Sequence, residues 1–548
     1  MTNTRQKVSF FNFEAYVEFD FVIVGAGSAG CALANRLSAD GRHTVALLEA
    51  GGPDRSPWIH VPVGYFKTIK DPSLNWMYRT EPDPGLNGRS INWPRGKTLG
   101  GSSSINGLLY VRGQPQDYDH WRQLGNTGWG WEDVLPYFRR AESWEGGASE
   151  LRGGEGPLAV ARSNKSWKIV DAWVQAAQHS GFPYNDDYNG ASQEGVGYFQ
   201  LTARNGLRCS AAKAYLKPVR SRSNLAVLTG FLTSRVLFEG PSAVGVSGYR
   251  NGAPVEVRAR CEVILSAGAI SSPQILMLSG IGDGNELSTH DIETRHHTPG
   301  VGKNLQDHLQ ARPVYKCTVP TINTRSRGIW NQAMIGLEYL AKRSGPLTMA
   351  ASLGTGYLKT RPELSTPDIQ FHIQPFSAEN PTIGVDDFDA FTASVLQLRP
   401  ESRGEIRLKT GQIADYPRIH PNYLSTTRDQ QTIVEGIRMA RRICRASPVA
   451  DLITEEFRPG SAVSDEDDDA LLDWARETAT TIYHPTGTCK MGSDPMAVVD
   501  ERLRVRSVDR LRVADCSIMP QIVSGNTNAP AIMIGEKASD MILEDARA

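Results

Sequence analysis

Three glycines at positions 25, 27 and 30 have the spacing of a phosphate-binding turn. In such a turn the first glycine permits a tight bend and the second lets the backbone approach a pyrophosphate, while the third lets a helix pack closely on a strand. The N–H groups at the start of that helix, including those of Ser28 and Ala29, have no partner within it and bind phosphate oxygens. The spacing predicts a bound nucleotide diphosphate, and a glycine-rich turn without a ligand is the alternative.

An acidic residue, Glu49, lies 24 residues beyond Gly25 and just before Ala50. A carboxylate at this place accepts hydrogen bonds from ribose hydroxyls and repels a 2′-phosphate. The motif by itself does not separate FAD from NAD. Two observations favour FAD: the fingerprint lies near the first residue of a long chain, and a second glycine-rich segment follows about seventy residues later.

The elements that must position these residues form a βαβ unit. Phe19–Val24 is a short apolar run typical of a buried parallel strand, and Cys31–Leu37 has the periodicity of a helix that Gly41 would end. Thr44–Leu48 is expected to be the second strand, with Glu49 at its end. The glycine turn therefore joins a strand to a helix, as a dinucleotide site requires.

Further along the chain the elements are shorter and separated by long loops. Glycine- and proline-rich stretches predict ordered loops at 51–64, 81–107 and 298–304, and the acidic run 462–469 predicts a solvated loop and helix start. Strands are expected at 225–228, 262–265, 369–373 and 394–398, and helices near 331–342, 427–446 and 529–543.

The overall composition excludes several classes of protein. The 548 residues carry a formal net charge of −1, so the chain offers no basic surface for nucleic acid. No apolar run approaches the roughly 18 residues of an integral membrane segment, and the charged first twenty residues do not resemble a secretory signal. Seven scattered cysteines without paired spacing predict reduced thiols in a cytoplasmic protein, with no disulfide frame and no metal site.

Six collinear motifs carry a resemblance to a known family. They are Arg95–Gly113, Gly268–Gly282, Gly300–His308, His484–Gly492, Leu511–Asp515 and Asn526–Pro530. Together with the N-terminal fingerprint they resemble the glucose–methanol–choline (GMC) oxidoreductases, and within that family the branch of choline dehydrogenases and bacterial primary-alcohol dehydrogenases. The resemblance implies FAD-dependent oxidation of an alcohol.

The resemblance also implies an α/β (α+β) fold with two interleaved domains. A Rossmann-like FAD-binding domain is expected from 1–160, 204–309 and 475–548. A substrate-binding domain, built on an antiparallel sheet flanked by helices, is expected from 161–203 and 310–474.

The loop 95–107 contains four glycines and three consecutive serines, so it can lie flat along a cofactor and donate hydrogen bonds to it. Ile105 stands where family members that attach FAD covalently carry histidine, which predicts non-covalent FAD. Carried over as cofactor contacts, besides Gly25, Gly27, Ser28, Ala29, Gly30, Glu49 and Ala50, are Arg95, Leu99, Gly100, Gly101, Asn106, Gly107, Val236, Asp515, Asn526, Thr527 and Asn528.

The resemblance places a catalytic base at His484, in a loop that Pro485 and Gly487 restrict. A histidine near the hydroxyl accepts its proton as hydride leaves the carbon for flavin N5. Asn526 aligns with the second catalytic position, where an amide orients the substrate oxygen but cannot act as a base. Asn528 is expected to cap the helix from 529 to 543, whose N-terminus would direct partial positive charge toward the flavin.

The wall of the substrate cavity is expected between about 310 and 470. Choline-specific relatives carry a glutamate where this chain has Gln310, so we expect an uncharged primary alcohol, oxidised to the aldehyde. Choline oxidation, a hydroxynitrile lyase-type reaction that keeps FAD without redox use, and a nicotinamide dehydrogenase are the alternatives. O2 and a separate electron acceptor both stay open, as does the oligomeric state. Aromatic residues of this region suit an apolar pocket, although each is more often core than pocket: Trp330, Tyr339, Phe371, Phe376, Phe388 and Phe391.

Overall fold

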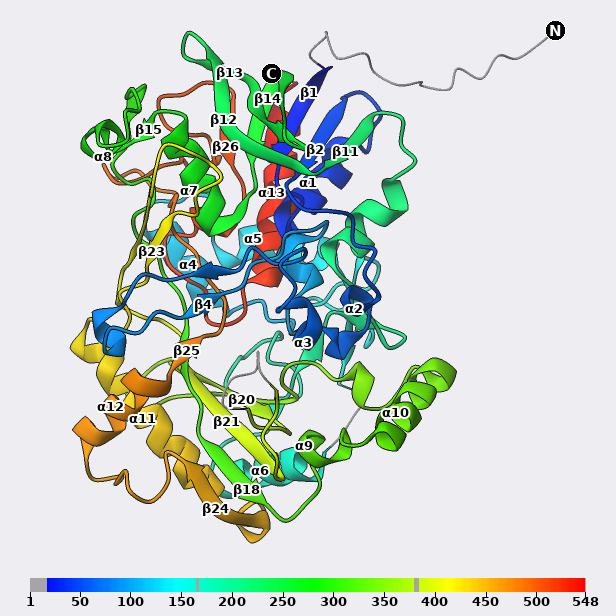
Figure 1. The fold of residues 1–548 in the computed structure, drawn as a ribbon, viewed down its shortest axis with the longest axis vertical. Helices are drawn as coiled ribbons and strands as arrows, with labels where there is room; N and C mark the ends of the chain where they lie inside the picture. The colour runs from blue at the N-terminus through cyan, green and yellow to red at the C-terminus, as the bar shows by residue number, and fades with distance from the viewer. Residues whose placement is uncertain (1–16, 164–166, 379–383, 548) are drawn as a thin grey trace, which may run out of the picture.

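Two large sheets organise the computed structural model, which describes residues 17–163, 167–378 and 384–547. Figure 1 shows the first sheet in the upper half of the molecule and the second in the lower half. The predicted α/β fold with a Rossmann-like part and an antiparallel substrate-domain sheet is confirmed.

The first sheet has seven strands in the order β11-β2-β1-β14-β13-β12, and β26 pairs with the C-terminal end of β14. Its parallel part joins β11, β2, β1, β14 and β26, and β12 and β13 continue it as an antiparallel meander. The strands are β1 Val17–Val24, β2 Val45–Glu49, β11 Leu225–Thr229, β12 Phe231–Glu239, β13 Ser242–Arg250, β14 Ala253–Leu265 and β26 Leu511–Val513.

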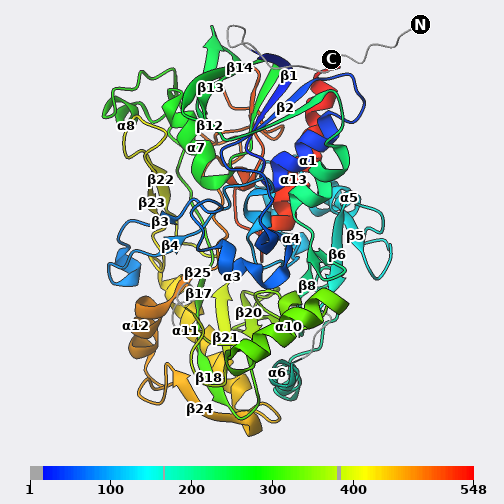
Figure 2. The same cartoon turned by 45° about the vertical axis from the view of Figure 1, so that its right-hand side comes forward.

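Helix α1 (Ser28–Leu37) follows β1 and crosses the C-terminal helix α13 (Asn528–Asp545), as Figure 2 shows. The crossing is close because a side chain at Gly535 would place its Cβ 2.5 Å from the carbonyl oxygen of Ala29. The predicted strand–helix–strand unit is present, but α1 ends at Leu37 with Ser38 as its C-cap, and Gly41 does not end it. The Ser38 hydroxyl donates to the Ala34 carbonyl at 2.7 Å, which satisfies the helix end before the glycine is reached.

The second sheet has eight strands, and all of its pairings are antiparallel. Helices α6 (Lys168–His179) and α11 (Thr427–Cys444) pack against it. The strands are β7 Gly195–Tyr198, β17 Leu309–Ala311, β18 Val314–Cys317, β19 Gly354–Leu358, β20 Ile369–Gln374, β21 Ala390–Gln397, β24 Ile453–Arg458 and β25 Thr480–Thr481. Every residue of the central strands β20 and β21 is buried, although β20 alternates apolar and polar side chains. The polar residues His372 and Gln374 of β20 line a cavity.

The first sheet draws its strands only from the three stretches expected to bind FAD. The second draws mainly on the intervening stretches, but β25 falls within 475–548 and pairs with β17. The exact domain boundaries stay a prediction. Further helices are α7 Gly268–Leu278, α10 Ile329–Lys342 and α12 Asp468–Thr478, and short helical turns are η1 Pro62–Gly64, η3 Gly101–Ser104 and η6 Pro346–Thr348.

Two expectations about the whole chain concern cysteines and membranes. All seven cysteines are free thiols. In the part of the chain that the structure describes, no helix has the length and apolar character needed to cross a membrane.

Candidate active site

A cavity is lined by residues of both sheets and runs from the glycine turn to the second sheet. At one end lie Gly25 and Glu49, and at the other His372 and Gln374 of β20. His484 and Asn526 line the same cavity. The sequence-predicted nucleotide site and catalytic pair therefore face one continuous space.

At the nucleotide end of the cavity, glycine residues without side chains let a ligand approach the backbone closely. Gly25 has a φ of +101°, and Gly101 comes so close that a Cβ there would lie 2.8 Å from the Gly27 Cα. Gly27, Ser28 and Ala29 line the cavity at the start of α1, where the first N–H groups have no intrahelical partner. These features fit the pyrophosphate of FAD.

Glu49 is buried at the end of β2 and accepts two backbone hydrogen bonds, from Ala26 at 3.0 Å and from Gly51 at 2.8 Å. Burial raises the pKa of its carboxyl to about 7, and the two N–H donors oppose that shift. The carboxylate thus ties the glycine turn to the loop after β2, with remaining lone pairs available to ribose hydroxyls.

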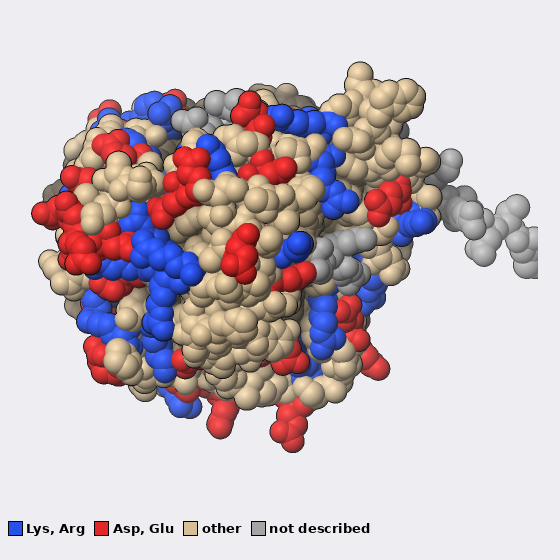
Figure 3. Space-filling model, turned by 90° about the horizontal axis from the view of Figure 1, so that it is seen from below, with Lys and Arg blue, Asp and Glu red and all other residues tan. Residues whose placement is uncertain are grey.

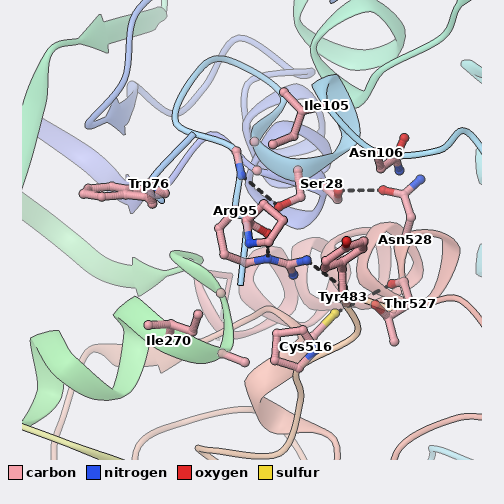
Figure 4. Close-up of a pocket in the computed structure, with 18 of the residues that line it drawn as sticks. Ser28, Trp76, Arg95, Ile105, Asn106, Ile270, Tyr483, Cys516, Thr527 and Asn528 are labelled. Atoms are coloured by element: carbon pink, nitrogen blue, oxygen red, sulfur yellow. Dashed lines mark hydrogen bonds between the residues drawn. The ribbon is translucent and has the colours of Figure 1, made fainter. Parts of the chain in front are cut away.

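The N-terminus of α13 meets that of α1 at the cavity wall. Figure 4 shows Ser28 and Asn528 pointing toward each other, and the Ser28 hydroxyl donates to the Asn528 side-chain oxygen at 2.7 Å. Helix α13 begins at Asn528, so this residue is inside the helix and the expectation that it is the N-cap is wrong. Thr527 holds the cap position without a side-chain hydrogen bond. Two helix N-termini face the cavity, and both favour negative charge there.

Most of the expected cofactor contacts lie on the cavity wall, and four lie elsewhere. Gly30 packs against Gly25, where a Cβ would lie 1.9 Å from the carbonyl oxygen, and Gly100 donates its N–H to the Ala26 carbonyl. Leu99 is in the hydrophobic core, and the Val236 N–H donates to Ser279. On the wall are Gly25, Gly27, Ser28, Ala29, Glu49, Ala50, Arg95, Gly101, Asn106, Gly107, Asp515, Asn526, Thr527 and Asn528.

The protonation pattern of His484 follows from three hydrogen bonds. His308 Nε2 lies 2.8 Å from the Leu398 carbonyl oxygen, which only accepts, so this nitrogen carries a hydrogen. In a neutral ring His308 Nδ1 is then an acceptor, and its partner 3.0 Å away, His484 Nδ1, must be the donor. His484 Nε2 is left with a lone pair, and Asn526 Nδ2 donates to it at 3.0 Å.

Both imidazoles are held neutral. Burial lowers the pKa of His308 to about 4. Burial also lowers the pKa of His484 well below its usual value, and the neighbouring His308, His372 and Arg95 lower it further. A neutral His484 with an unprotonated Nε2 at the cavity wall is the state that a proton acceptor needs.

The loop that carries His484 is fixed from two sides. The Asp307 carboxylate accepts from the His484 backbone N–H at 2.7 Å and from the hydroxyls of Tyr423 and Thr481. Arg95 donates to the Tyr483 carbonyl at 2.6 Å, as Figure 4 shows, and Tyr483 has a φ of +73°. A tyrosine in that region is strained, so these bonds hold the base in place.

The substrate end of the cavity is polar and positively charged. Arg312 lies on its wall, and its guanidinium donates a hydrogen bond of 3.3 Å to the Gln374 side-chain oxygen. Nearby wall residues have buried polar atoms without a partner among the described residues, namely Tyr65 Oη, Gln310 Oε1 and His372 Nε2. Buried polar groups are normally paired, so these atoms mark a place where a ligand with polar groups binds.

The predicted aromatic wall is mostly core. Phe376 lines the cavity, whereas Phe371, Phe391 and Tyr339 are buried outside its lining. Phe388 is half-buried and stacks edge-on against Phe457. The expectation that Trp330 belongs to core or pocket is wrong, because this side chain is 85% exposed.

Sequence reasoning missed His308, Arg312 and His372. His308 stands in the Gly300–His308 motif, next to the aspartate that holds the His484 loop, so the motif itself held the signal. Arg312 is two residues beyond Gln310, but only the fold shows that its side chain reaches the cavity.

The fold and the site have the features of a dinucleotide-binding enzyme with a buried, hydrogen-bonded histidine pair beside the nucleotide end. Residues 19–310 match the amino-terminal part of the GMC oxidoreductase family, and residues 400–535 match its carboxy-terminal part. The chain therefore belongs to the GMC oxidoreductase family. It is an FAD-dependent enzyme that oxidises the CH–OH group of an alcohol.

Relatives and solved structures cover nearly the whole chain. The mitochondrial choline dehydrogenase of Mus musculus is 44% identical over 96% of this chain and 89% of its own length. An alcohol dehydrogenase [acceptor] of Pseudomonas putida is 43% identical over 96% of each chain. The pyridoxine 4-oxidase from Mesorbium loti superposes with a TM-score of 0.87 at 32% identity, covering 95% of this chain and 98% of its own.

Proposed function

We propose that this chain converts an uncharged primary alcohol to the aldehyde, with FAD bound non-covalently and His484 as the general base. Bound along the cavity wall, FAD would supply the acceptor for the hydride of the carbinol carbon. One observation carries the proposal: a chain of hydrogen bonds runs from the Leu398 carbonyl through His308 to His484 Nδ1. This chain leaves His484 Nε2, which faces the cavity, with a lone pair.

The residues divide the remaining work between them. The substrate hydroxyl replaces the hydrogen bond of 3.0 Å between the Asn526 amide and His484 Nε2 and makes one hydrogen bond to each of these groups. His484 accepts the hydroxyl proton, and the Asn526 amide donates to the oxygen as negative charge develops on it. His308 Nδ1 accepts a hydrogen bond from His484 Nδ1–H, and this bond keeps the His484 ring oriented.

The charge at the substrate end supports an alcohol without a cationic group. Among the described wall residues Glu49 and Asp515 are the acidic ones, and both are engaged at the nucleotide end. Among the described residues, the substrate end carries Gln310 and Arg312 and no carboxylate that would attract an ammonium group, and the Arg312 cation repels such a group.

The wall chemistry also supports non-covalent FAD. Ile105 lines the cavity and offers no atom that attaches to a flavin. Cys516 lines it too, but burial raises the pKa of its thiol to about 12, so the sulfur stays protonated and unreactive. Acid precipitation of the purified holoenzyme should leave the yellow flavin in the supernatant, and flavin in the pellet would contradict this assignment.

Anaerobic flavin reduction across an alcohol panel tests the substrate class. We expect benzylic and aliphatic primary alcohols to bleach the flavin, and choline to do so slowly if at all. Arg312→Gln should raise the bimolecular rate constant for choline by about tenfold while changing that for benzyl alcohol little. Arg312→Lys is the matched control, because it keeps the charge and should leave choline a poor substrate. Faster bleaching by choline than by every neutral alcohol would refute the proposal.

Choline oxidation is the second candidate, because several of the similar proteins are choline dehydrogenases. The same panel separates the two. Failure of the whole panel to bleach the flavin would favour a lyase reaction in which FAD has no redox role.

We also propose a cytoplasmic location, which the seven free thiols support. Cell fractionation with antibody detection tests it. Reoxidation by O2 and by a separate acceptor are both retained, and oxygen consumption during turnover distinguishes them.

A further inference from the structure

Helix α10 turns an apolar face to the outside of the molecule. Its anchor is Tyr339, which is buried and whose hydroxyl donates to the Gly206 carbonyl at 3.0 Å. The opposite face carries large apolar side chains with high exposed fractions: Ile329 85%, Trp330 85%, Met334 63%, Leu337 59% and Leu340 72%.

These side chains form one continuous stripe. At 100° per residue the five positions, with Ala333 and Ala341 between them, span an arc of about 140°. The acidic residue of the helix, Glu338, lies off this arc and accepts a hydrogen bond from the Ser344 hydroxyl. Monomeric proteins seldom expose a contiguous apolar stripe of this kind, so it marks an interaction site.

Basic residues stand at both ends of the stripe. Arg325 and Arg327 precede α10, Lys342 is its last residue, and Arg343 follows it, and all four are exposed. In Figure 3 the lobe that protrudes at the upper right, on the side where Figure 1 places α10, is mostly tan, with blue side chains close by.

From this pattern we infer that α10 docks the protein on an anionic lipid bilayer. A helix with an apolar stripe, a tryptophan in its first turn and flanking cations lies in the membrane interface with its axis parallel to the surface. The apolar side chains enter the boundary between headgroups and acyl chains, and the cations pair with anionic headgroups. The helix does not cross the bilayer.

A second copy of the chain fits the stripe less well. Two α10 helices packed face to face, parallel or antiparallel, bring basic ends against basic ends. Like charges so placed repel each other, whereas an anionic lipid surface complements both ends at once. The charge pattern therefore selects the membrane.

The docking site is connected to the wall of the cavity. After α10 the chain enters η6, which packs against η1. Tyr65 directly follows η1, and Ala351 lies three residues after η6, and both line the cavity. Docking through α10 would thus bring the catalytic cavity close to lipid-dissolved alcohols and electron acceptors.

Vesicle co-sedimentation of the purified holoenzyme tests the inference. We expect binding to vesicles of phosphatidylcholine mixed with phosphatidylglycerol, weaker binding to phosphatidylcholine alone, and a loss of binding as salt screens the charges. Trp330→Ser/Leu337→Ser should lower the partition coefficient by about tenfold or more. Arg327→Gln/Lys342→Gln should weaken binding to the anionic vesicles only.

Two control variants remove exposed apolar side chains elsewhere. Leu124 and Tyr249 are 46% and 44% exposed, and Leu124→Ser and Tyr249→Ser should leave vesicle binding unchanged. The flavin spectrum and the rate of flavin reduction by a water-soluble alcohol should be the same in all variants, since none of these residues lines the cavity. Absence of parent binding to anionic vesicles at low salt overturns the inference. Equal binding by the Trp330→Ser/Leu337→Ser variant does so as well, and so does a dimer in light scattering that this variant converts to monomer.

Discussion

At the scale of single residues, the reactive nitrogen of His484 depends on a partner that does not touch the substrate. Removing the base itself by His484→Ala should slow flavin reduction by about 10² to 10⁴-fold, because the hydroxyl proton loses its acceptor. Stopped-flow anaerobic reduction measures this, with the flavin spectrum as the check that FAD is retained. A variant as fast as the parent would show that another group takes the proton.

His308 is a positioning residue, and its replacement should have a different signature. His308→Gln keeps a side chain near His484 Nδ1 but no longer fixes which nitrogen carries the hydrogen. We expect a smaller fall in the reduction rate than for His484→Ala, about tenfold to a hundredfold, with little change in substrate Kd. A large change in Kd with an unchanged rate would assign His308 to binding instead.

The pH dependence follows from the lowered pKa of His484. The base works unprotonated, and burial together with His308, His372 and Arg95 disfavours its protonated form. Because the pKa is lowered, the limiting rate of flavin reduction should stay constant above neutral pH and fall only in acid, below the ordinary histidine value of about 6.5. An inflection above about pH 7 in that rate would contradict the burial argument.

At the scale of elements, two helical glycines should respond oppositely to the same substitution. Gly535→Ala puts a Cβ against the Ala29 carbonyl at the α1–α13 crossing, so we expect destabilisation by about 1–3 kcal/mol. Gly336→Ala in α10 meets nothing within 4 Å and should stabilise by about 0.5–1 kcal/mol. Thermal unfolding followed by circular dichroism compares the two. Equal shifts for both variants would mean that the crossing yields without strain.

The strand–helix–strand unit around Gly25 could be predicted because local sequence determines it. Glycine spacing, an apolar strand and a terminal acid each constrain the same short stretch. The His308–His484 contact could not be predicted in this way, since it joins residues 176 positions apart. It arises because β17 lies between β21 and β25, and this register sets His308 between Leu398 and His484.

The sequence also does not show which side chains are buried, which are exposed and which line the cavity. Periodicity predicted a helix near 331–342, and the structure contains α10 there, but periodicity does not show what covers an apolar face. Trp330 was therefore assigned to the interior and is exposed. The family motif identifies Gln310 from the sequence. Arg312 lies in the turn between β17 and β18, and only the fold shows that it lines the cavity.

At the scale of the whole molecule, the cavity is assembled from segments far apart in the sequence. Gly25 and Glu49 belong to the first strand–helix–strand unit, and Gly101 and Asn106 belong to the glycine-rich loop 95–107. Asn528 begins the C-terminal helix α13. A cofactor that touches all of them favours the folded state over the unfolded one. Added FAD at a hundred times its Kd should stabilise the apoprotein by about 2.7 kcal/mol and raise its Tm. Adding riboflavin, which lacks the diphosphate, is the control and should raise the Tm less; equal effects would argue against the role assigned to the glycine turn.

The hydrogen-bonded row at the base ends on the main-chain oxygen of Leu398, just after β21 in the second sheet. No side-chain replacement removes that oxygen, so the chemistry of the base is tied to the place of a strand. Two hydrogen bonds thereby link His484 to the second sheet. Moving β21 away from His308 would free the His308 ring to turn, and His484 Nε2 would no longer be held unprotonated. Alignment of the two sheets thus acts as a precondition for turnover as well as a means of enclosing the substrate.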